Sequence, residues 1–323
     1  MKPDTKLEVG KLPEAYRPAS RINGKFYLII PVLICGCLIW FGYNQWKNPP
    51  QIQKTPEHLE PKKRVWWQPD LLKTLPALAD GYRNEKFLPQ YNMTTCSIRG
   101  NFEKITAAVN CYLFDTPNYI KAKKTISTDL EGNGFCGTKP PLSLNAWNEW
   151  KKYLTKPIRK LAIVQQPLER FVRQFKEFCE RQKLCFDCGV NVSCFMRKLK
   201  MEHEKIAEGL DGSVRSYLTH TFSPQSWNCH FHRHLKEFDF IKVGGNVTEK
   251  AEYVDQLTNI LEQQGVSKNL TDTIRTEIDK IPMELTTEET ELYITIRKDE
   301  DKFRLFRRLY EYDYLIFGFS IEN

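Results

Sequence analysis

The sequence predicts an α/β domain with a central parallel sheet, preceded by one transmembrane helix. Three observations lead to this prediction. One long apolar run lies near the N-terminus, two later segments have the pattern of a strand, a loop and a helix, and the cysteines after the apolar run are even in number. Alternating strands and helices are typical of parallel sheets, whose strands are joined by crossover helices. Residues 89–323 are enough for one sizeable domain of this kind.

The apolar run is residues 26–43, which carry no charged side chain. As a helix they would span about 27 Å, close to the hydrocarbon thickness of a bilayer. A cleaved signal peptide is one alternative, but the run is longer than a signal-peptide core and no small-residue cleavage pattern follows it. A buried core helix is another, and apolar side chains on every face argue against it. We therefore expect a signal anchor at 26–43, a tail at 1–25 and a stem at 44–88.

The distribution of basic residues predicts the orientation of this anchor. Six Lys or Arg residues lie in the tail, whereas Lys47 and Lys54 are the nearest ones after the anchor. The positive-inside rule then places the tail in the cytosol and residues 44–323 in the lumen of the secretory pathway, as in a single-pass type II membrane protein. Four N-x-Ser/Thr sequons, which predict a glycoprotein, all fall in the lumenal part: Asn92, Asn191, Asn246 and Asn269.

The cysteines agree with a lumenal domain. Cys35 and Cys37 lie in the apolar run, and an oxidising lumen would pair the other eight in up to four disulfides. These eight are Cys96, Cys111, Cys136, Cys179, Cys185, Cys188, Cys194 and Cys229. The pairing stays open, but the four cysteines between 179 and 194 predict at least one local disulfide, with longer bonds from Cys96 or Cys111. Zinc is the alternative for Cys185, Cys188 and Cys194, whose spacing is typical of metal ligands, and the oxidising lumen disfavours it.

Two segments have the strand, loop and helix pattern. In residues 91–113 an extended start is followed by a turn at Arg99-Gly100-Asn101 and a helix from Phe102. The apolar face of this helix holds Ile105, Ala108, Val109 and Tyr112. In residues 160–179 a short apolar strand, 161–164, precedes Pro167 at the start of a helix. The apolar face of this second helix holds Leu168, Phe171, Val172, Phe175 and Cys179.

Two further helices are predicted at 249–264, which Gly265 ends, and at 301–310. The loops that leave parallel strands are places where phosphates bind, because the next helix offers unpaired N–H groups and the positive end of its dipole. The two strand-to-helix loops therefore predict a nucleotide site. Neither loop carries a Gly-x4-Gly-Lys-Ser/Thr or Gly-x-Gly-x-x-Gly pattern, so the pattern alone indicates it weakly.

Several motifs occur in the order known from one family. They are Cys96-Ser-Ile-Arg99, Cys111-Tyr-Leu113, residues 162–171, Cys185-Phe-Asp-Cys188, Ser193-Cys-Phe195, residues 222–229 and residues 312–319. Together they resemble the nematode branch of the carbohydrate sulfotransferase family, which includes the chondroitin 4-O-sulfotransferases. The resemblance implies a Golgi type II membrane protein with a P-loop-like sulfotransferase fold. It also implies transfer of sulfuryl from 3′-phosphoadenosine 5′-phosphosulfate (PAPS) to a hydroxyl of a glycan such as chondroitin. A second sulfotransferase is a possible partner; neither a metal nor a nucleic acid is expected.

The family's phosphate-binding residues are altered in this chain. Members of the family have a Lys and a Ser-Thr pair in the first loop, and an Arg and a later Ser in the second. This sequence has Gly100 and Glu103-Lys104 at the first positions, and Gln165 and Arg173 at the second. The residues that the resemblance indicates for the cofactor are Arg99, Gly100, Asn101, Lys104, Gln165, Arg170 and Arg173. These changes also support an alternative, a catalytically impaired relative that binds a glycan or a partner enzyme.

The catalytic residue is not identified by the sequence, and His220 and Lys104 are the candidates. The family's His-Phe-x-Pro-Gln appears as Thr221-Phe-Ser-Pro-Gln225, so His220 is one place early and, on a strand, would point to the opposite face. For Arg170 an ion pair with Glu169 or Glu177 on a helix surface is the alternative to phosphate binding. The basic stretch 197–205 suits either a glycan or a solvated helix face.

A run of histidines is the remaining candidate for metal binding. His230, His232 and His234 would share one face of a strand, where they could capture copper or zinc. A polar surface run is the commoner origin of this spacing, so the sequence predicts no metal site.

Overall fold

The computed structural model describes residues 73–82, 84–130, 135–137, 157–210, 216–244 and 247–321. The predicted anchor, the cytosolic tail, most of the stem and the sequon at Asn246 lie outside these residues. Within the described ranges, no helix combines the length and apolarity that a membrane span needs. The anchor at 26–43 therefore stays a prediction.

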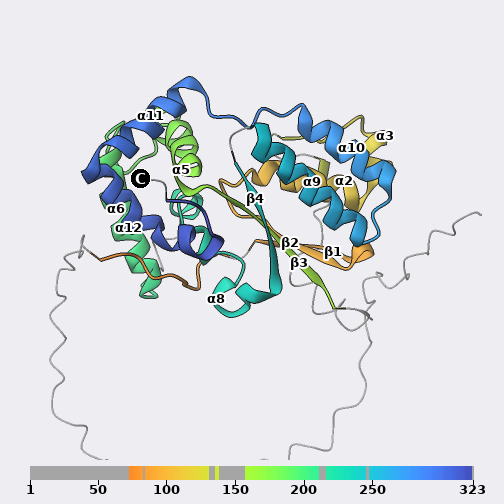
Figure 1. Ribbon diagram of the computed structural model, residues 1–323, viewed down its shortest axis with the longest axis horizontal. Coiled ribbons are helices and arrows are strands. Elements are labelled where there is room, and N and C mark those ends of the chain that lie inside the picture. Colours follow the sequence, from red (N-terminus) through yellow and green to blue (C-terminus); the bar gives the residue numbers. More distant parts are fainter. Residues whose placement is uncertain are drawn as a thin grey trace, which may run out of the picture. The chain divides into compact units, whose positions relative to one another are not determined.

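Four strands form one sheet in the order β1-β2-β3-β4 (Figure 1). They are β1 (Glu85–Leu88), β2 (Met93–Cys96), β3 (Arg159–Gln165) and β4 (Phe238–Val243). The predicted parallel pair is confirmed, since β2 runs parallel to β3 with Cys96 opposite Ala162, and β4 continues the parallel order. The edge strand β1 is antiparallel to β2. The sheet is thus mostly parallel in a mixed α/β domain.

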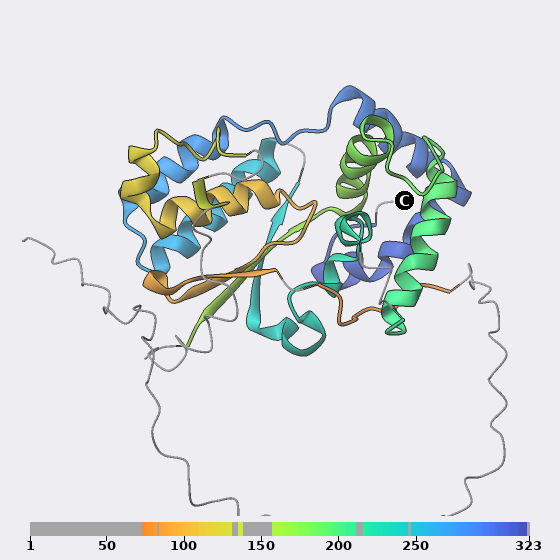
Figure 2. The ribbon, with the colours of Figure 1, turned by 180° about the vertical axis from the view of Figure 1, so that it is seen from behind.

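Helices α2, α9 and α10 pack with one face of this sheet (Figures 1 and 2). Their bounds are Glu103–Phe114, Val247–Gln263 and Lys268–Asp279. Leu161 and Ile163 point into this core, whereas Ala162 and Val164 belong to the cluster on the opposite face. This alternation is the two-residue period of a strand covered on both sides. The predicted apolar face of α2 is confirmed, because all four of its side chains are buried.

A second group of helices packs around the aromatic side chains that follow β3 (Figure 2). It contains α5 (Pro167–Phe175), which continues as one π-helical segment (Lys176–Arg181), α6 (Val192–Ala207), α11 (Thr287–Lys298) and α12 (Glu300–Phe317). The predicted start of α5 at Pro167 and its apolar face are confirmed. Helix α12 extends well beyond the predicted 301–310 and ends at Gly318, whose φ of 64° is left-handed.

All eight cysteines of the described domain form disulfides. The pairs are Cys96–Cys229, Cys111–Cys136, Cys179–Cys185 and Cys188–Cys194. The predicted local bonds within 179–194 are therefore present, and Cys96 and Cys111 make the longer ones. Because every one of these sulfurs is paired, the zinc alternative for the 185–194 group is wrong. Each bond is expected to contribute about 2–4 kcal/mol by restricting the unfolded chain.

The expectation that the histidines lie on strands is wrong. His220 belongs to a short helix, α7 (Tyr217–Thr221), which begins because the Ser216 side chain caps it in a capping box with Thr219. His232 and His234 belong to α8 (Phe231–His234), and His230 precedes it with a left-handed φ of 56°. The strand-based argument about which face His220 points to therefore does not apply.

Candidate donor site

The two predicted loops meet at one edge of the sheet. Strands β2 and β3 are parallel, so their carboxyl ends lie at the same edge, where α2 and α5 begin. The Asn101 side chain donates to the carbonyl of Ile163 at 2.9 Å, and Arg170 donates to the carbonyl of Arg99 at 2.8 Å. These contacts join one loop directly to the other. The structure therefore brings together Arg99, Gly100, Asn101, Gln165 and Arg170, as expected for a shared site.

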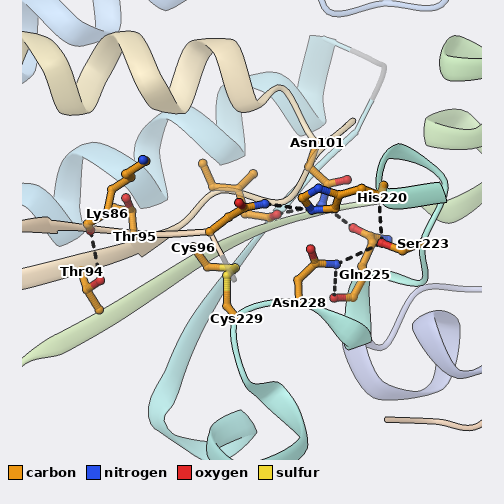
Figure 3. Close-up of a disulfide and its surroundings, with 12 residues drawn as sticks. Lys86, Thr94, Thr95, Cys96, Asn101, His220, Ser223, Gln225, Asn228 and Cys229 are labelled. Atoms are coloured by element: carbon orange, nitrogen blue, oxygen red, sulfur yellow. Dashed lines mark hydrogen bonds between the residues drawn. A yellow bond between two sulfur atoms is a disulfide. The ribbon is translucent and has the colours of Figure 1, made fainter. Parts of the chain in front are cut away.

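Gln225 and Asp313 organise this edge. The Gln225 side chain accepts from the backbone N–H of Gln165 at 2.8 Å and from the Asn101 side chain, and it donates to the Gln165 carbonyl at 2.8 Å. Asp313 accepts from the backbone N–H groups of Gln225 and Ser226 at 2.8 and 3.0 Å. Figure 3 shows Asn101 and Gln225 among the residues that surround the Cys96–Cys229 disulfide. Sequence reasoning did not identify Gln225 or Asp313 as site residues, although they lie within the motifs 222–229 and 312–319.

Asp313 is fully buried, and this burial raises the pKa of its carboxyl group. The two backbone hydrogen bonds act in the opposite direction, because they stabilise the charged form, and so does the positive charge of Arg170. Asp313 is thus hydrogen-bonded to the loop that carries Gln225 and interacts electrostatically with Arg170, which joins the two strand-to-helix loops.

The first loop is engaged by its own helix. Glu103, in the first turn of α2, accepts a hydrogen bond from the backbone N–H of Gly100 at 2.9 Å. Gly100 has φ of 82°, and a Cβ there would lie 3.2 Å from the Arg170 guanidinium, so glycine suits this position. A phosphate at this helix N-terminus would seek N–H groups of this kind. The Glu103 carboxylate therefore takes the place of an anionic ligand at this N–H group.

Arg170 acts as a clamp between backbone segments. The residue is 2% exposed, and its guanidinium donates to the carbonyls of Arg99, Thr221 and Ser223. Burial lowers the pKa of Arg170, while Tyr310, Asp313 and Glu103 act in the opposite direction. The expected alternative, a surface ion pair with Glu169 or Glu177, is wrong because the side chain points into the protein. In this arrangement Arg170 positions the loops and its donors are used by carbonyl groups.

The other basic candidates lie around this clamp. Arg173 donates to the carbonyls of Met283 and Glu284 and lies over the Phe102 ring, 5.0 Å from its centroid. Burial lowers its pKa. Arg99 is half-buried, with its guanidinium 4.1 Å from the centre of the Tyr217 ring. Lys104 is exposed in the first turn of α2. Arg99 and Lys104 are therefore the better placed to meet a ligand.

The second loop holds a buried polar side chain that fits a ligand. Gln165, at the end of β3, is fully buried, and within the described part of the chain neither atom of its amide group has a hydrogen-bond partner. A buried amide without a partner is costly, so a water molecule or a bound polar group is expected to satisfy it. The family resemblance of the sequence implies that this position corresponds to a phosphate-binding Arg in other members.

His220 is one of the two catalytic candidates, and it lies on α7. Its helix, α7, contacts both loops through Arg99 and Arg170. The ring stacks on Tyr82, with 3.9 Å between centroids, and its Nε2 lies 2.9 Å from the amide nitrogen of Asn84. If this amide donates, Nε2 accepts and the ring proton is on Nδ1. His220 is then held in one tautomer, with its basic nitrogen in contact with Asn84.

A cavity of about 740 Å³ lies beyond the ends of β3 and β4. The start of α5 contributes Gln166 and Glu169, and α11 contributes Tyr293, Arg297 and Lys298 to its wall. Lys242 lies at the end of β4, 5.2 Å from the centre of the Phe319 ring. Cations beside aromatic rings can hold an anionic sugar, since the rings pack on its apolar face.

Comparison with known proteins agrees with this architecture. Residues 85–320 match the sulfotransferase family. Carbohydrate sulfotransferase chst-1 of Caenorhabditis elegans is 25% identical over 267 residues, covering 76% of this chain and 78% of that protein. No solved structure shows a significant match. Because the family match spans most of the sequence and includes both loops, this chain belongs to the sulfotransferase family.

Proposed function

We propose that this protein is a carbohydrate O-sulfotransferase of the Golgi lumen, which transfers sulfuryl from PAPS to a glycosaminoglycan such as chondroitin. The observation that carries the proposal is the meeting of the loops after β2 and β3 at one sheet edge, joined by Gln225 and Arg170. Two helix N-termini facing one edge suit a nucleotide with phosphates at both ends. Family membership supports sulfate transfer to a carbohydrate.

PAPS would supply an activated sulfuryl group at this edge. The Gly100 N–H and the nearby Lys104 are the groups proposed for its 5′ side. The unsatisfied amide of Gln165 is proposed for its 3′ side. Glu103 has to turn away from Gly100 before that N–H can meet a phosphate, and its charge opposes an anionic ligand. We therefore expect a donor site of low affinity.

His220 is proposed as the base that takes the proton of the acceptor hydroxyl. Proton removal needs a basic nitrogen within hydrogen-bond reach of that hydroxyl. Nε2 is the nitrogen proposed for this role, and the Asn84 amide that contacts it at 2.9 Å would have to turn aside. The 740 Å³ cavity, whose wall does not include His220, is proposed to hold a part of the glycan beyond the reacting sugar, where Arg297 and Lys298 would meet its acidic groups. The wall also carries the carboxylates of Glu169, Glu249 and Glu252, which oppose an anionic ligand. The formal charge of +8 favours a polyanionic acceptor as well.

The proposed location is the Golgi membrane, with the anchor at 26–43 and the domain in the lumen. The bias of Lys and Arg toward residues 1–25 supports this topology. Four disulfides support it too, because they persist in an oxidising compartment.

A second candidate function is favoured by the contacts inside the loops. Glu103 engages Gly100, and Arg170 and Arg173 donate to backbone carbonyls. A chain with these contacts can keep the fold and bind a glycan or a partner sulfotransferase without transferring sulfate. This second function does not require PAPS. A measurement of PAPS-dependent transfer therefore distinguishes the two functions.

Radiolabelled PAPS and chondroitin test the first function against the second. The full-length protein is expected to transfer label slowly, and His220→Gln should reduce the rate about 100-fold or more if it removes the base. His234→Gln, outside the site, is the matched control. Binding of chondroitin without any transfer, in a protein that still has its disulfides, would support the second function and overturn the first.

A further inference from the structure

Asp80, His230 and His232 form a cluster outside the donor site. One carboxylate oxygen and one ring nitrogen from each histidine all lie within 4.8 Å of one another. In the described ranges this is the one group of three such side chains whose ligand atoms converge in this way. Two imidazoles and a carboxylate are a ligand set typical of divalent transition metals.

Backbone contacts hold the two contributing segments together. The N–H of Tyr82 donates to the Trp227 carbonyl at 3.0 Å, and the N–H of Cys229 donates to the Tyr82 carbonyl at 2.7 Å. A Cβ on Gly81 would lie 2.4 Å from the Trp227 carbonyl oxygen, so only glycine allows this approach. Asp80, next to Gly81, is thereby held close to the residues that follow Trp227.

A left-handed turn then presents both histidines to Asp80. Cys229 and His230 have φ of 48° and 56°, values that are uncommon for residues with a Cβ. The Cys96–Cys229 disulfide fixes one side of the turn. On the other side Phe231 is buried, with 4.9 Å between the centroids of its ring and the Phe238 ring. The rings of His230 and His232, on either side of Phe231 in the sequence, have centroids 5.9 Å apart.

His232 has buried nitrogens that nothing in the described chain satisfies. Both Nδ1 and Nε2 are inaccessible to solvent and lack a hydrogen-bond partner among the described residues. His234, two residues later, is different, since its Nδ1 lies 2.7 Å from a Glu237 carboxylate oxygen. The expected grouping of His230, His232 and His234 is therefore replaced by His230, His232 and Asp80.

The geometry points to a zinc-type divalent metal site formed by Asp80, His230 and His232. Tetrahedral zinc with bonds of about 2.0–2.2 Å needs ligand atoms about 3.3 Å apart, so the side chains have to close by about 1.5 Å at most. Asp80 is exposed and can make this movement, and that open side leaves a fourth position for water. No thiolate competes, because the eight described cysteines are in disulfides.

Such a site would join the segment before β1 to the segment before β4. Residues 79–82 and 227–232 come from distant parts of the sequence, and a metal would add a link to their backbone bridge. The three residues of the cluster are different from those proposed for the donor site, so the metal site is predicted whether or not the protein transfers sulfate.

Metal titration of the full-length protein, first stripped with a chelator, tests the site. Calorimetry with ZnCl2 is expected to give one ion per chain with a Kd of about 1 µM or tighter, and saturating zinc should raise Tm by several degrees. His232→Ala, His230→Ala and Asp80→Asn should each weaken binding at least tenfold. His234→Ala should bind as the unmodified protein does. Co²⁺ in the same site should show the intense visible absorption of four-coordinate cobalt.

Three results would overturn the proposal. One is the absence of zinc and cobalt binding at about 100 µM metal, well above the expected Kd. Another is binding that survives both histidine substitutions. The third is an equal loss in His234→Ala, which would indicate general capture by surface histidines. Metal-free melting curves of all four variants show whether each has folded, so a folding defect is not mistaken for lost binding.

Discussion

The carboxylate of Glu103 accepts a hydrogen bond from the backbone N–H of Gly100, at 2.9 Å. This contact places a negative side chain on a donor that a phosphate would use. The same edge keeps the two strand-to-helix loops in contact and leaves the Gln165 amide without a partner among the described residues. The architecture of the sulfotransferase family is thus combined with a carboxylate at the first strand-to-helix loop.

The clamp role of Arg170 predicts a large loss of stability on substitution. Arg170→Met would leave the carbonyls of Arg99, Thr221 and Ser223 without their donor, at a cost of about 3 kcal/mol or more. Arg173→Met, which releases carbonyls nearer the surface, should cost about 1–2 kcal/mol. Urea unfolding of the three proteins measures this difference. A loss from Arg170→Met no larger than that from Arg173→Met would contradict the clamp.

A buried histidine predicts how stability depends on pH. Burial lowers the pKa of His203 to about 4, the nearby charge of Arg170 adds to the shift, and the hydrogen bond to the Thr219 carbonyl opposes it. In the unfolded chain the pKa is near 6.5. Between these values the unfolded state binds more protons, so a fall in pH favours unfolding. The contribution of His203 to the free energy of unfolding should decrease by up to about 3 kcal/mol as pH falls from 6.5 to 4.

His203→Gln isolates this effect, because other buried groups such as Asp313 are unchanged. The free energy of unfolding of both proteins is measured at about pH 7 and about pH 4.5. The unmodified protein should lose more stability on acidification than the variant. Equal losses would show that His203 is not held neutral in the folded protein.

Exposure predicts which sequons carry glycans. Asn191 and Asn269 are exposed, whereas the Asn92 amide donates to the Pro157 carbonyl at 2.8 Å. We expect glycans on Asn191 and Asn269, so that Asn191→Gln and Asn269→Gln each remove one step of the gel shift caused by a peptide-N-glycosidase. Asn92→Gln should leave the shift unchanged. No shift, together with digestion of the domain by protease added to sealed vesicles, would contradict the lumenal topology.

Periodic elements could be predicted from the sequence. Val109 and Tyr112 in α2, and Phe171 and Phe175 in α5, recur at helical spacing next to short apolar strands, so the two units and their parallel pairing followed. Helices α10 and α11 were not predicted. In α10, Leu270, Ile274 and Ile278 recur every four residues, so an apolar stripe was present and was overlooked. In α11 the buried residues are Glu289 and Ile296, so packing against the domain rather than an apolar pattern decides this helix.

The candidate site was predicted only in outline. The loops were located, but the Gln225 and Asp313 hydrogen bonds join residues 60 and 88 positions apart, and no sequence period encodes such contacts. The expectation that His220 lies on a strand was wrong because a single cap at Ser216 turns the segment into a helix. The burial of Arg170 was missed since a basic residue is usually exposed, and only three converging carbonyls compensate it.

Calorimetry with adenosine 3′,5′-bisphosphate tests the donor site most directly. The unmodified protein should bind it weakly, and Glu103→Ser combined with Gln165→Arg should bind about 100-fold more tightly, since one change frees the Gly100 N–H and the other restores a charged donor. Glu291→Ser, an exposed change on α11, is the control and should bind as weakly as the unmodified protein. A Kd of about 1–10 µM for the unmodified protein, or no gain in a double variant that melts normally, would contradict a phosphate loop held by Glu103.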